Sequence, residues 1–333
     1  MAKTGKSTAT IHNVAEACGV SARTVSRVMN GQAHVRPALR ERILETAQAM
    51  GYRPDPSARA LKSGRKRIIG IVVNAVSSDT TFKRIEHISK LCSAWEHAVL
   101  VRFAENSEME ESTVESLMPW CDGMVIFSNL RTVRSPVLDS LTENGFPFML
   151  VDPPHPVPYP AVRIDRARGY REAAEYLIGK GRKKPVLLVE HFRSGDRIRG
   201  FKKGLQSAGI PFSDDMIFST GKEYAGGRNA APELIRAIRK KKADAVICHN
   251  DKMVLGLMNA FIREGIHVPK DAALIGYDDD SFTPYTSPAI TTIAQLGGNP
   301  ADFIFEQIRD NIENGTAMKS KTLRTGLIIR ESA

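Results

Sequence analysis

The residues TIHNVAEACGVSARTVSRVMN, numbered 10 to 30, decide how the amino-terminal part of the chain folds. Apolar side chains recur in this stretch at helical spacing, and Gly19 interrupts the pattern. A glycine is favoured just beyond the end of a helix, and a serine such as Ser21 favours the beginning of the next one. The stretch therefore predicts two short helices joined by a tight turn.

A third helix is predicted to complete this unit. Thr10 is a suitable cap for the first helix, Pro37 suits the first position of the third, and Gly51 favours the left-handed conformation that ends a helix. Three such helices predict a small all-α helix-turn-helix headpiece over residues 1–54. Its predicted core consists of the apolar residues at helical spacing: Val14, Ala15, Val25, Val28, Leu39, Ile43, Ala47 and Met50.

The second helix carries two arginines on the face that points away from this core. Arg23 and Arg27 are one helical turn apart, whereas Val25, Val28 and Met29 turn inward. On a helix that enters the major groove of DNA, each guanidinium can read a guanine edge through a pair of hydrogen bonds. The alternative is an ordinary surface helix with two solvated arginines.

The positive charge of the protein is concentrated at this end. The whole chain has a formal net charge of +10, and residues 1–67 hold 13 Lys and Arg against 4 Asp and Glu. The remaining chain is therefore close to neutral. A compact basic segment on a neutral protein favours a polyanionic partner such as DNA, although a solvated basic tail has the same composition.

From residue 68 the pattern changes to apolar runs that alternate with helical stretches. Such continuous runs are typical of buried parallel strands in a doubly wound α/β sheet. Six runs exceed one comfortable sheet, which predicts two lobes, and the proline-rich segment 152–160 is predicted to be a rigid, extended loop near their junction. The predicted strands are 68–73, 123–127, 146–151, 185–189, 245–248 and 273–276.

Two segments carry a specific family resemblance. Residues 20–30, VSARTVSRVMN, and residues 51–61, GYRPDPSARAL, strongly resemble the lactose repressor and galactose repressor (LacI/GalR) family. The resemblance covers the whole chain and implies a transcriptional regulator, a repressor in particular, with a two-lobed periplasmic-binding-protein-like domain over residues 68–333. Further pieces in the family's order are Gly200-Phe201, Asn250-Asp251, Val268-Pro269, Gly276 to Asp278 and Thr291 to Ile293.

By position, the resemblance implies which residues of the headpiece contact DNA. Ala22, Arg23 and Arg27 would face base edges, where the short side chain of Ala22 would touch a thymine methyl or simply allow close approach. Ser26 lies on the same outward face. The residues implied to lie near the phosphates are Ser21, Thr24, Asn30 and His34.

Residues 55–67 resemble the family's hinge, which begins with a short helix that is ordered on operator DNA. Ala58 and Leu61 fall on this helix, and Leu61 resembles the apolar wedge that enters a minor-groove step and kinks the duplex. The alternative for Leu61 is packing of the hinge onto the large domain. Pro54 and Pro56 stiffen the approach to the helix, which would reduce the order change that couples ligand to DNA.

The resemblance also implies a small-molecule site in the cleft between the lobes, where loops at the carboxyl ends of strands converge. Arg197 would form forked bonds with vicinal hydroxyls or a carboxylate, and Asp278 would accept bonds from hydroxyls. The structural alternatives are a surface charge for Arg197, helix caps for Asn250 and Asp278, and a core position for Phe82. The implied effector-binding residues are Phe82, Asp152, Ile164, Arg193, Arg197, Lys222, Asn250, Asp278 and Gln295.

Lys222 departs from the usual sugar site of the family, because an aromatic residue that stacks on the ligand often occupies this position. Arg193 is expected nearby, and an excess of cationic groups favours an anionic effector such as a sugar acid or a sugar phosphate. An alignment shifted by two residues would instead place Tyr224 there and restore a neutral sugar site.

Catalysis, a cofactor and a structural metal are not expected. The sequence contains no phosphate loop, no Gly-x-Ser-x-Gly elbow and no metal-spaced histidine pair. The acidic triplet 278–280 would suit magnesium, but loops after strands often carry such residues for capping. The four cysteines are far apart, which predicts reduced core residues and neither a disulfide nor a zinc site.

The expected location is the cytoplasm, and the expected assembly is a homodimer on double-stranded, near-palindromic operator DNA. The first residues lack the apolar run of a signal peptide, and no stretch approaches the length of a membrane span. These features and the headpiece argue against a transport-type binding protein. The chain ends at residue 333 without a trailing leucine heptad, which favours a dimer over a tetramer. A DNA-bound architectural protein without an effector remains an alternative.

Overall fold

The computed structural model describes residues 9–29, 35–52, 64–74, 79–190 and 194–333. The chain divides into two compact units, Met1–Arg67 and Ile68–Ala333. The boundary between the predicted headpiece and hinge lies outside the described residues.

The first unit contains the three predicted helices, α1 (Ile11–Ala17), α2 (Ala22–Met29) and α3 (Pro37–Ala49). Thr10 caps α1 by accepting a hydrogen bond from the Asn13 amide, while the Asn13 side chain accepts one from the Thr10 amide. Gly19 and Gly51 have φ values of 61° and 65°, as expected for residues that end helices. The helix-turn-helix prediction is therefore confirmed.

Buried residues from all three helices form the core of this unit. Val14, Val25, Val28 and Ile43 are all buried there. The prediction is wrong for Met50, which is the carboxyl-terminal cap of α3 and is 40% exposed. The helical pattern extends to Met50, but the helix ends one residue earlier and turns this side chain outward.

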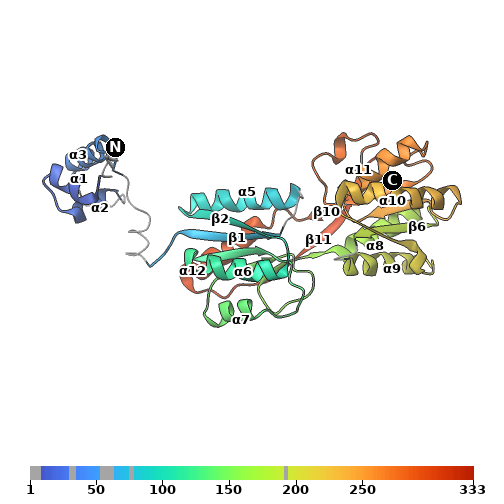
Figure 1. Ribbon diagram of the computed structural model, residues 1–333, viewed down its shortest axis with the longest axis horizontal. Coiled ribbons are helices and arrows are strands. Elements are labelled where there is room, and N and C mark those ends of the chain that lie inside the picture. Colours follow the sequence, from blue (N-terminus) through green and yellow to red (C-terminus); the bar gives the residue numbers. More distant parts are fainter. Residues whose placement is uncertain (1–8, 30–34, 53–63, 75–78, 191–193) are drawn as a thin grey trace, which may run out of the picture. The chain divides into compact units, whose positions relative to one another are not determined.

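The second unit consists of two lobes, each with a parallel sheet between two layers of helices (Figure 1). In the first lobe α5 and α12 cover one face, and α6 and α7 cover the other. The strands of this lobe are β1 (Ile68–Asn74), β2 (Ala98–Ala104), β3 (Gly123–Phe127), β4 (Phe148–Val151) and β5 (Ala161–Asp165). Its helices are α5 (Asp79–Ala94), α6 (Ser107–Leu117), α7 (Pro136–Glu143) and α12 (Ala301–Asn314).

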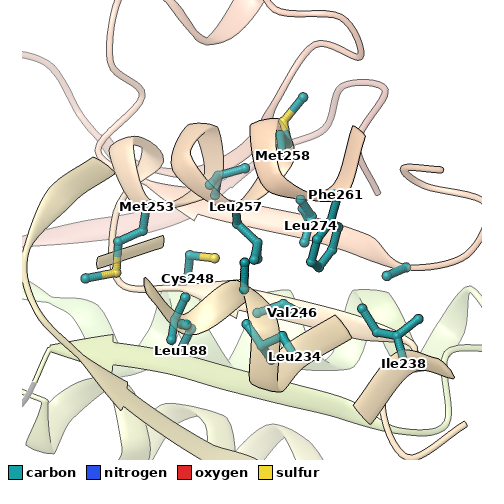
Figure 2. Packing of buried hydrophobic residues seen from close by; sticks show 14 of the residues in the cluster. Leu188, Leu234, Ile238, Val246, Cys248, Met253, Leu257, Met258, Phe261 and Leu274 are labelled. Atoms are coloured by element: carbon teal, nitrogen blue, oxygen red, sulfur yellow. The ribbon is translucent and has the colours of Figure 1, made fainter. Parts of the chain in front are cut away.

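In the second lobe α10 and α11 cover one face, and α8 and α9 cover the other. Figure 2 shows the first of these two layers, in which Leu257 and Phe261 of α11 pack against Leu188, Val246 and Leu274 of the sheet. The strands are β6 (Pro185–Glu190), β7 (Ile217–Thr220), β8 (Ala245–Cys248), β9 (Ala273–Tyr277) and β10 (Thr291–Leu296). The helices are α8 (Arg166–Gly179), α9 (Gly195–Ser207), α10 (Glu223–Arg239) and α11 (Asp251–Arg263).

The last strand, β11 (Lys321–Ile328), joins the two lobes into one hydrogen-bonded sheet. Its first residues pair in parallel with β5 of the first lobe, and its later residues pair in antiparallel fashion with β10 of the second. Arg324 takes part in both pairings. The two predicted lobes are therefore confirmed, but they share one continuous sheet of 11 strands.

Several smaller predictions concern the interior of the protein. All four cysteines are buried and free, as predicted. The proline-rich segment 152–160 connects β4 with β5, and the hydroxyl oxygen of its buried Tyr159 accepts a hydrogen bond from the Ser135 amide at 2.9 Å. Among the described residues, no helix is long and apolar enough to cross a membrane, and no cluster of His, Cys, Asp and Glu could hold a metal.

Candidate DNA-reading helix and effector cleft

The outward face of α2 is formed by the residues predicted to read DNA. Arg23 and Arg27 are exposed, whereas Val25 and Val28 of the same helix are buried in the core. A helix whose inner face is fixed in this way holds both guanidinium groups on one side. Ala22, Thr24 and Ser26 are half-buried, and Ser21 is exposed.

Two local interactions fix the turn that precedes this helix. Ser21 Oγ accepts a hydrogen bond from the Thr24 amide at 3.2 Å and lies 2.9 Å from the Thr24 hydroxyl. From α3, Arg42 donates to the carbonyl oxygen of Cys18 at 2.7 Å. The role of Arg42 was not predicted, because nothing in the sequence relates it to the turn. Four further predicted contact residues lie outside the described residues: Asn30, His34, Ala58 and Leu61.

A cavity of about 740 Å³ lies between the two lobes of the second unit. It is located where β4, β5, β6, β8 and β9 end and where the following helices begin, as expected for a doubly wound fold. Seven of the nine predicted effector-binding residues line it: Asp152, Ile164, Arg197, Lys222, Asn250, Asp278 and Gln295.

The other two predicted residues are placed differently. Phe82 lies on α5, is 69% exposed and is not among the described residues that line the cavity. It belongs neither to the cleft nor to the core, because the neighbouring Thr81 and Arg84 occupy the inner face of the helix. Arg193 lies outside the described residues.

Arg197 lies beside the stacked rings of Tyr170 and Tyr277 in the cleft. It is only 6% exposed, its Nε donates to the Tyr170 hydroxyl at 3.1 Å, and its guanidinium carbon lies 5.3 Å from the centroid of the Tyr277 ring. A surface charge is therefore excluded for Arg197. Cation–π contacts and the hydrogen bond fix the direction of the guanidinium group.

Four further arginines that line the cavity were not predicted, and two of them, Arg166 and Arg84, are held by partners within the cleft. Arg166, the first residue of α8, forms a two-pronged ion pair with Asp152, in which Nη1 lies 2.6 Å from Oδ1. Arg84 of α5 is 5% exposed and donates to the side-chain oxygen of Gln295. Both arginines occur in stretches without a recognisable motif, and β5, which directs Arg166 into the cleft, was not predicted.

Asp278 follows β9 and projects into a strongly charged environment. Burial and the nearby Asp280 raise the pKa of the Asp278 carboxyl to about 7, although Arg197, Arg166 and Arg84 act in the opposite direction. Its φ of 109° is unusual for a residue with a side chain. Asp278 is therefore both a buried acid near its titration point and a strained backbone position.

The other two residues of the acidic triplet, Asp279 and Asp280, anchor this loop to neighbouring elements. Asp251 accepts hydrogen bonds from the Asp280 amide at 2.9 Å and from the Thr292 hydroxyl at 2.6 Å. Asp279 pairs with Arg330 at 2.8 Å. Through these contacts the Asp279 side chain and the Asp280 backbone hold the loop after β9 in place.

Asn250 and Lys222 both lie at helix beginnings that face the cavity. The Asn250 side chain caps α11 by accepting a hydrogen bond from the Met253 amide at 2.9 Å. Asn250 is therefore a helix cap, and it also lines the cavity. Lys222 precedes α10 and lines the cavity, whereas Tyr224 is not among the described lining residues. The cationic residue, and not the aromatic one, therefore faces the cleft.

Hydrogen bonds connect the two lobes at one edge of the cleft. The Ser281 amide of the second lobe donates to Asp79 of the first at 3.2 Å, and the Ser281 hydroxyl donates to the same carboxylate. The Thr80 hydroxyl donates to the Asp278 carbonyl at 3.2 Å. The beginning of α5 is thus bonded directly to the loop that carries Asp278.

The sequence matches two known family models. Residues 10–55 match bacterial regulatory proteins of the lacI family, and residues 174–333 match a periplasmic binding protein-like domain. Among curated proteins, the HTH-type transcriptional repressor PurR of Vibrio vulnificus (strain CMCP6) is 30% identical over 314 residues. This match covers 91% of this chain and 92% of PurR.

Two solved structures have the same architecture. The transcriptional regulator CelR, solved in complex with cellobiose, matches with a TM-score of 0.69 at 25% identity, over 98% of this chain and 100% of CelR. The Lac repressor dimer bound to operator and the anti-inducer ONPF matches with a TM-score of 0.85 at 22% identity, over 97% of this chain and 98% of that one. At the latter identity the likeness concerns the fold.

A helix-turn-helix unit followed by a two-lobed domain with a cleft defines a class of sequence-specific, DNA-binding transcriptional regulators. The extent of the match to PurR and the two family models establish the family within this class. The chain belongs to the lacI family of bacterial regulatory proteins.

Proposed function

We propose that this protein is a repressor that binds a near-palindromic operator as a homodimer and responds to a small polar effector in its cleft. The observation that carries the proposal is the cavity of about 740 Å³ between two lobes, in a chain that begins with a helix-turn-helix unit. A cavity of this size suits a small molecule. PurR is named a repressor, the Lac repressor was solved as a dimer on its operator, and CelR was solved with cellobiose.

In this proposal α2 enters the major groove. Arg23 and Arg27 read guanine edges, because each guanidinium can donate two hydrogen bonds to one base. Ala22 and Ser26 approach the same base pairs. Ser21, Thr24, Asn30 and His34 position the helix on the phosphates, and Ala58 and Leu61 contact the minor groove.

The effector is proposed to contact the lining residues that the sequence analysis named. Asp152, Asn250 and Asp278 offer acceptors to hydroxyl groups, and Arg197 and Lys222 offer donors. Ile164 and Gln295 also line the cavity, and Arg193 is proposed to contribute a further cation. The lining holds as many acidic as basic residues, so the proposal of an anionic effector, a sugar acid or a sugar phosphate, rests on the positions of Arg197 and Lys222.

We further propose that the protein acts in the cytoplasm and has no catalytic role. The curated relative is a regulator, and none of the sought catalytic motifs occurs in the sequence. The acids that could suggest catalysis are engaged in the loop scaffold around Asp251 and Asp279.

DNA reading can be tested with operators selected by the protein from a random double-stranded library. Arg23→Ala and Arg27→Ala are each expected to weaken operator binding by about 1–3 kcal/mol, which is about 5- to 150-fold, and to relax the selected sequence at one position of each half-site. Binding is measured by fluorescence anisotropy at fixed salt. Arg40→Ala, which removes the same charge from α3, is expected to affect selected and random DNA equally.

Two results would contradict this assignment. The first is an arginine variant on α2 that weakens binding to selected and random DNA by the same factor. The second concerns the effector: a panel of sugars, sugar acids and sugar phosphates that changes neither operator affinity nor the melting temperature would overturn the ligand response.

A further inference from the structure

Four polar atoms of the cleft are buried and have no hydrogen-bond partner among the described residues. They are Nε of Arg84, Nε of Arg166, the Tyr277 hydroxyl and Oδ1 of Asp280, and all four residues line the cavity. In the described parts of the chain only two other buried side-chain atoms share this property. Because buried polar groups are normally paired, their concentration in the cleft indicates groups that a ligand completes.

Three of these atoms call for acceptors on the ligand. A guanidinium Nε can only donate, and a phenol hydroxyl donates readily to an anionic oxygen. Arg166 lies over the Tyr277 ring, with 5.8 Å between its guanidinium carbon and the ring centroid, and Arg84 interacts electrostatically with both. The three donors therefore form one cluster, and an oxygen pair of a single acidic group can satisfy several of them.

The fourth atom calls for a donor on the ligand. Oδ1 of Asp280 is buried at the opposite end of the charged loop from Tyr277, and the residue is only 1% exposed. The Asp280 amide is already engaged, because it donates to Asp251 at 2.9 Å. A hydroxyl group is the simplest neutral donor to this oxygen, so the ligand needs hydroxyls as well as an acid.

The balance of charges in the cavity favours an acid of low charge. The described lining residues include seven Arg and Lys and seven Asp and Glu. Because the pKa of Asp278 is raised to about 7, this balance becomes slightly positive near neutral pH. A carboxylate fits that small excess, whereas a phosphate dianion would bring an uncompensated charge into a buried site.

We propose that the effector is a hydroxylated monocarboxylate, of the sugar acid class, whose carboxylate accepts hydrogen bonds from Arg84, Arg166 and Tyr277 and whose hydroxyl donates to Asp280. This assignment rests on the proposed function, in which the cleft binds the effector, and it narrows the effector to one chemical class. Arg166 remains paired with Asp152 and offers its free Nε.

The test compares ligands with the same carbon skeleton and different charge. The full-length protein is titrated calorimetrically with D-glucose, D-gluconate and D-glucose 6-phosphate, and with the corresponding D-galactose, D-galactonate and D-galactose 6-phosphate. We expect at least one of the two acids to bind 10-fold or more tightly than its neutral sugar and its phosphate.

Two variants assign the preference to the cluster. Tyr277→Phe removes a hydroxyl that has no partner in the protein, so the fold should be retained while affinity for the acid falls about 10-fold. Arg84→Gln should lower it about 10- to 100-fold. Lys90→Gln, an exposed cation on the same helix, is the matched control and should stay within about 2-fold.

Each outcome separates this inference from the proposed function. If a neutral sugar or a phosphate binds as tightly as the acid, or if Tyr277→Phe leaves acid affinity unchanged, the carboxylate assignment is overturned while the effector response stands. If none of the six compounds binds, the carboxylate assignment is overturned, and the effector response is decided by the wider panel of sugars, sugar acids and sugar phosphates. If Arg84→Gln fails to fold, Tyr277→Phe decides alone.

Discussion

Asp278 carries two features that oppose folding. Its φ of 109° lies in a region that residues with side chains rarely adopt, and its carboxyl is buried beside Asp280. The native carboxyl keeps its proton up to about pH 7, whereas the unfolded one loses it near the ordinary value of 3.8. Between these values the native state holds more protons, so stability falls as pH rises, and the loss is complete above pH 7.

Asp278→Asn should remove this pH-dependent loss. Asparagine tolerates positive φ and does not ionise, so the variant should melt at a higher temperature than the parent at pH 8, and the difference should shrink towards pH 4. Melting curves across this range measure it. Burial raises the pKa of Asp251 most and the Asp278 charge adds to it, so the substitution also lowers the Asp251 pKa and changes the stability in the same direction.

Asp271→Asn provides a control of opposite sign. The His267 amide donates to Asp271 at 2.7 Å and lowers the pKa of this exposed carboxyl. Its substitution should therefore lower the melting temperature at neutral pH, with a difference that vanishes in acid. A difference for Asp278→Asn that is independent of pH would show that strain or packing, and not ionisation, dominates at that position.

Among the elements, the pair α8 and α9 determines where the cleft arginines lie. The helices approach so closely at Gly200 that a Cβ there would lie 2.2 Å from the Ala167 carbonyl oxygen. This contact brings the beginning of α8, with Arg166, close to Arg197 of α9. Packing therefore explains the Gly200-Phe201 pair that resembles the family, since Gly200 allows the close approach and Phe201 is fully buried next to it.

Gly200→Ala is expected to destabilise the protein by about 2 kcal/mol or more, because a clash with backbone forces the helices apart. Gly179→Ala is the matched control at the end of α8, where a Cβ would meet nothing within 4 Å. It should be neutral or stabilising by about 0.5–1 kcal/mol. Urea unfolding measures both, and equal stabilities for the two variants would contradict the close packing.

The strands that could be predicted from the sequence are those that are buried along their whole length. Strands such as β3 and β8 are buried on both faces, so their apolar runs were recognisable. In β2 exposed and half-buried residues alternate, β5 contains Arg163, and β10 begins with two threonines, so none of these strands has a continuous run. The helices of the headpiece were predictable because their caps are local.

The same limit applies to the cleft. Residues that follow predicted strands, such as Asp152 and Asp278, were placed in the lining. Arg84 could not be recognised, because a buried arginine inside a helix resembles a surface one until its partners in other elements are known. Tyr277 lies within the family piece Gly276 to Asp278, but its place in the lining was not predicted. Phe82, which the family resemblance implied to be at the cleft, lies on the exposed side of α5, because Thr81 and Arg84 occupy the inner side of this helix.

At the scale of the whole second unit, the two lobes are connected by side chains as well as by strands. Asp79 accepts two hydrogen bonds from Ser281, and the Ser281 hydroxyl contributes most to lowering the Asp79 pKa. This contact exists only when the beginning of α5 meets the loop after β9. It therefore favours the arrangement of lobes described above over a wider opening.

Asp79→Ala should shift the lobes towards the open arrangement. We expect effector affinity to fall about 2- to 10-fold and the radius of gyration without ligand to increase in X-ray scattering. Glu86→Ala is the control, since Glu86 pairs with Lys90 within α5. If Asp79→Ala and the control give the same scattering and affinity, the contact has no influence on the lobes.

The change of partner along β11 has a consequence for recombination between related genes. The chain passes between the lobes after β5, after β10 and again within β11, so the second lobe is assembled from residues 166–296 together with the last residues of the chain. A single crossover inside the large domain would combine halves of lobes that never shared an interface. Crossovers near Arg67, at the boundary between the two compact units along the sequence, leave every interface within the lobes intact. Hybrid regulators that exchange complete DNA-reading units should therefore arise far more readily than hybrids that exchange one lobe.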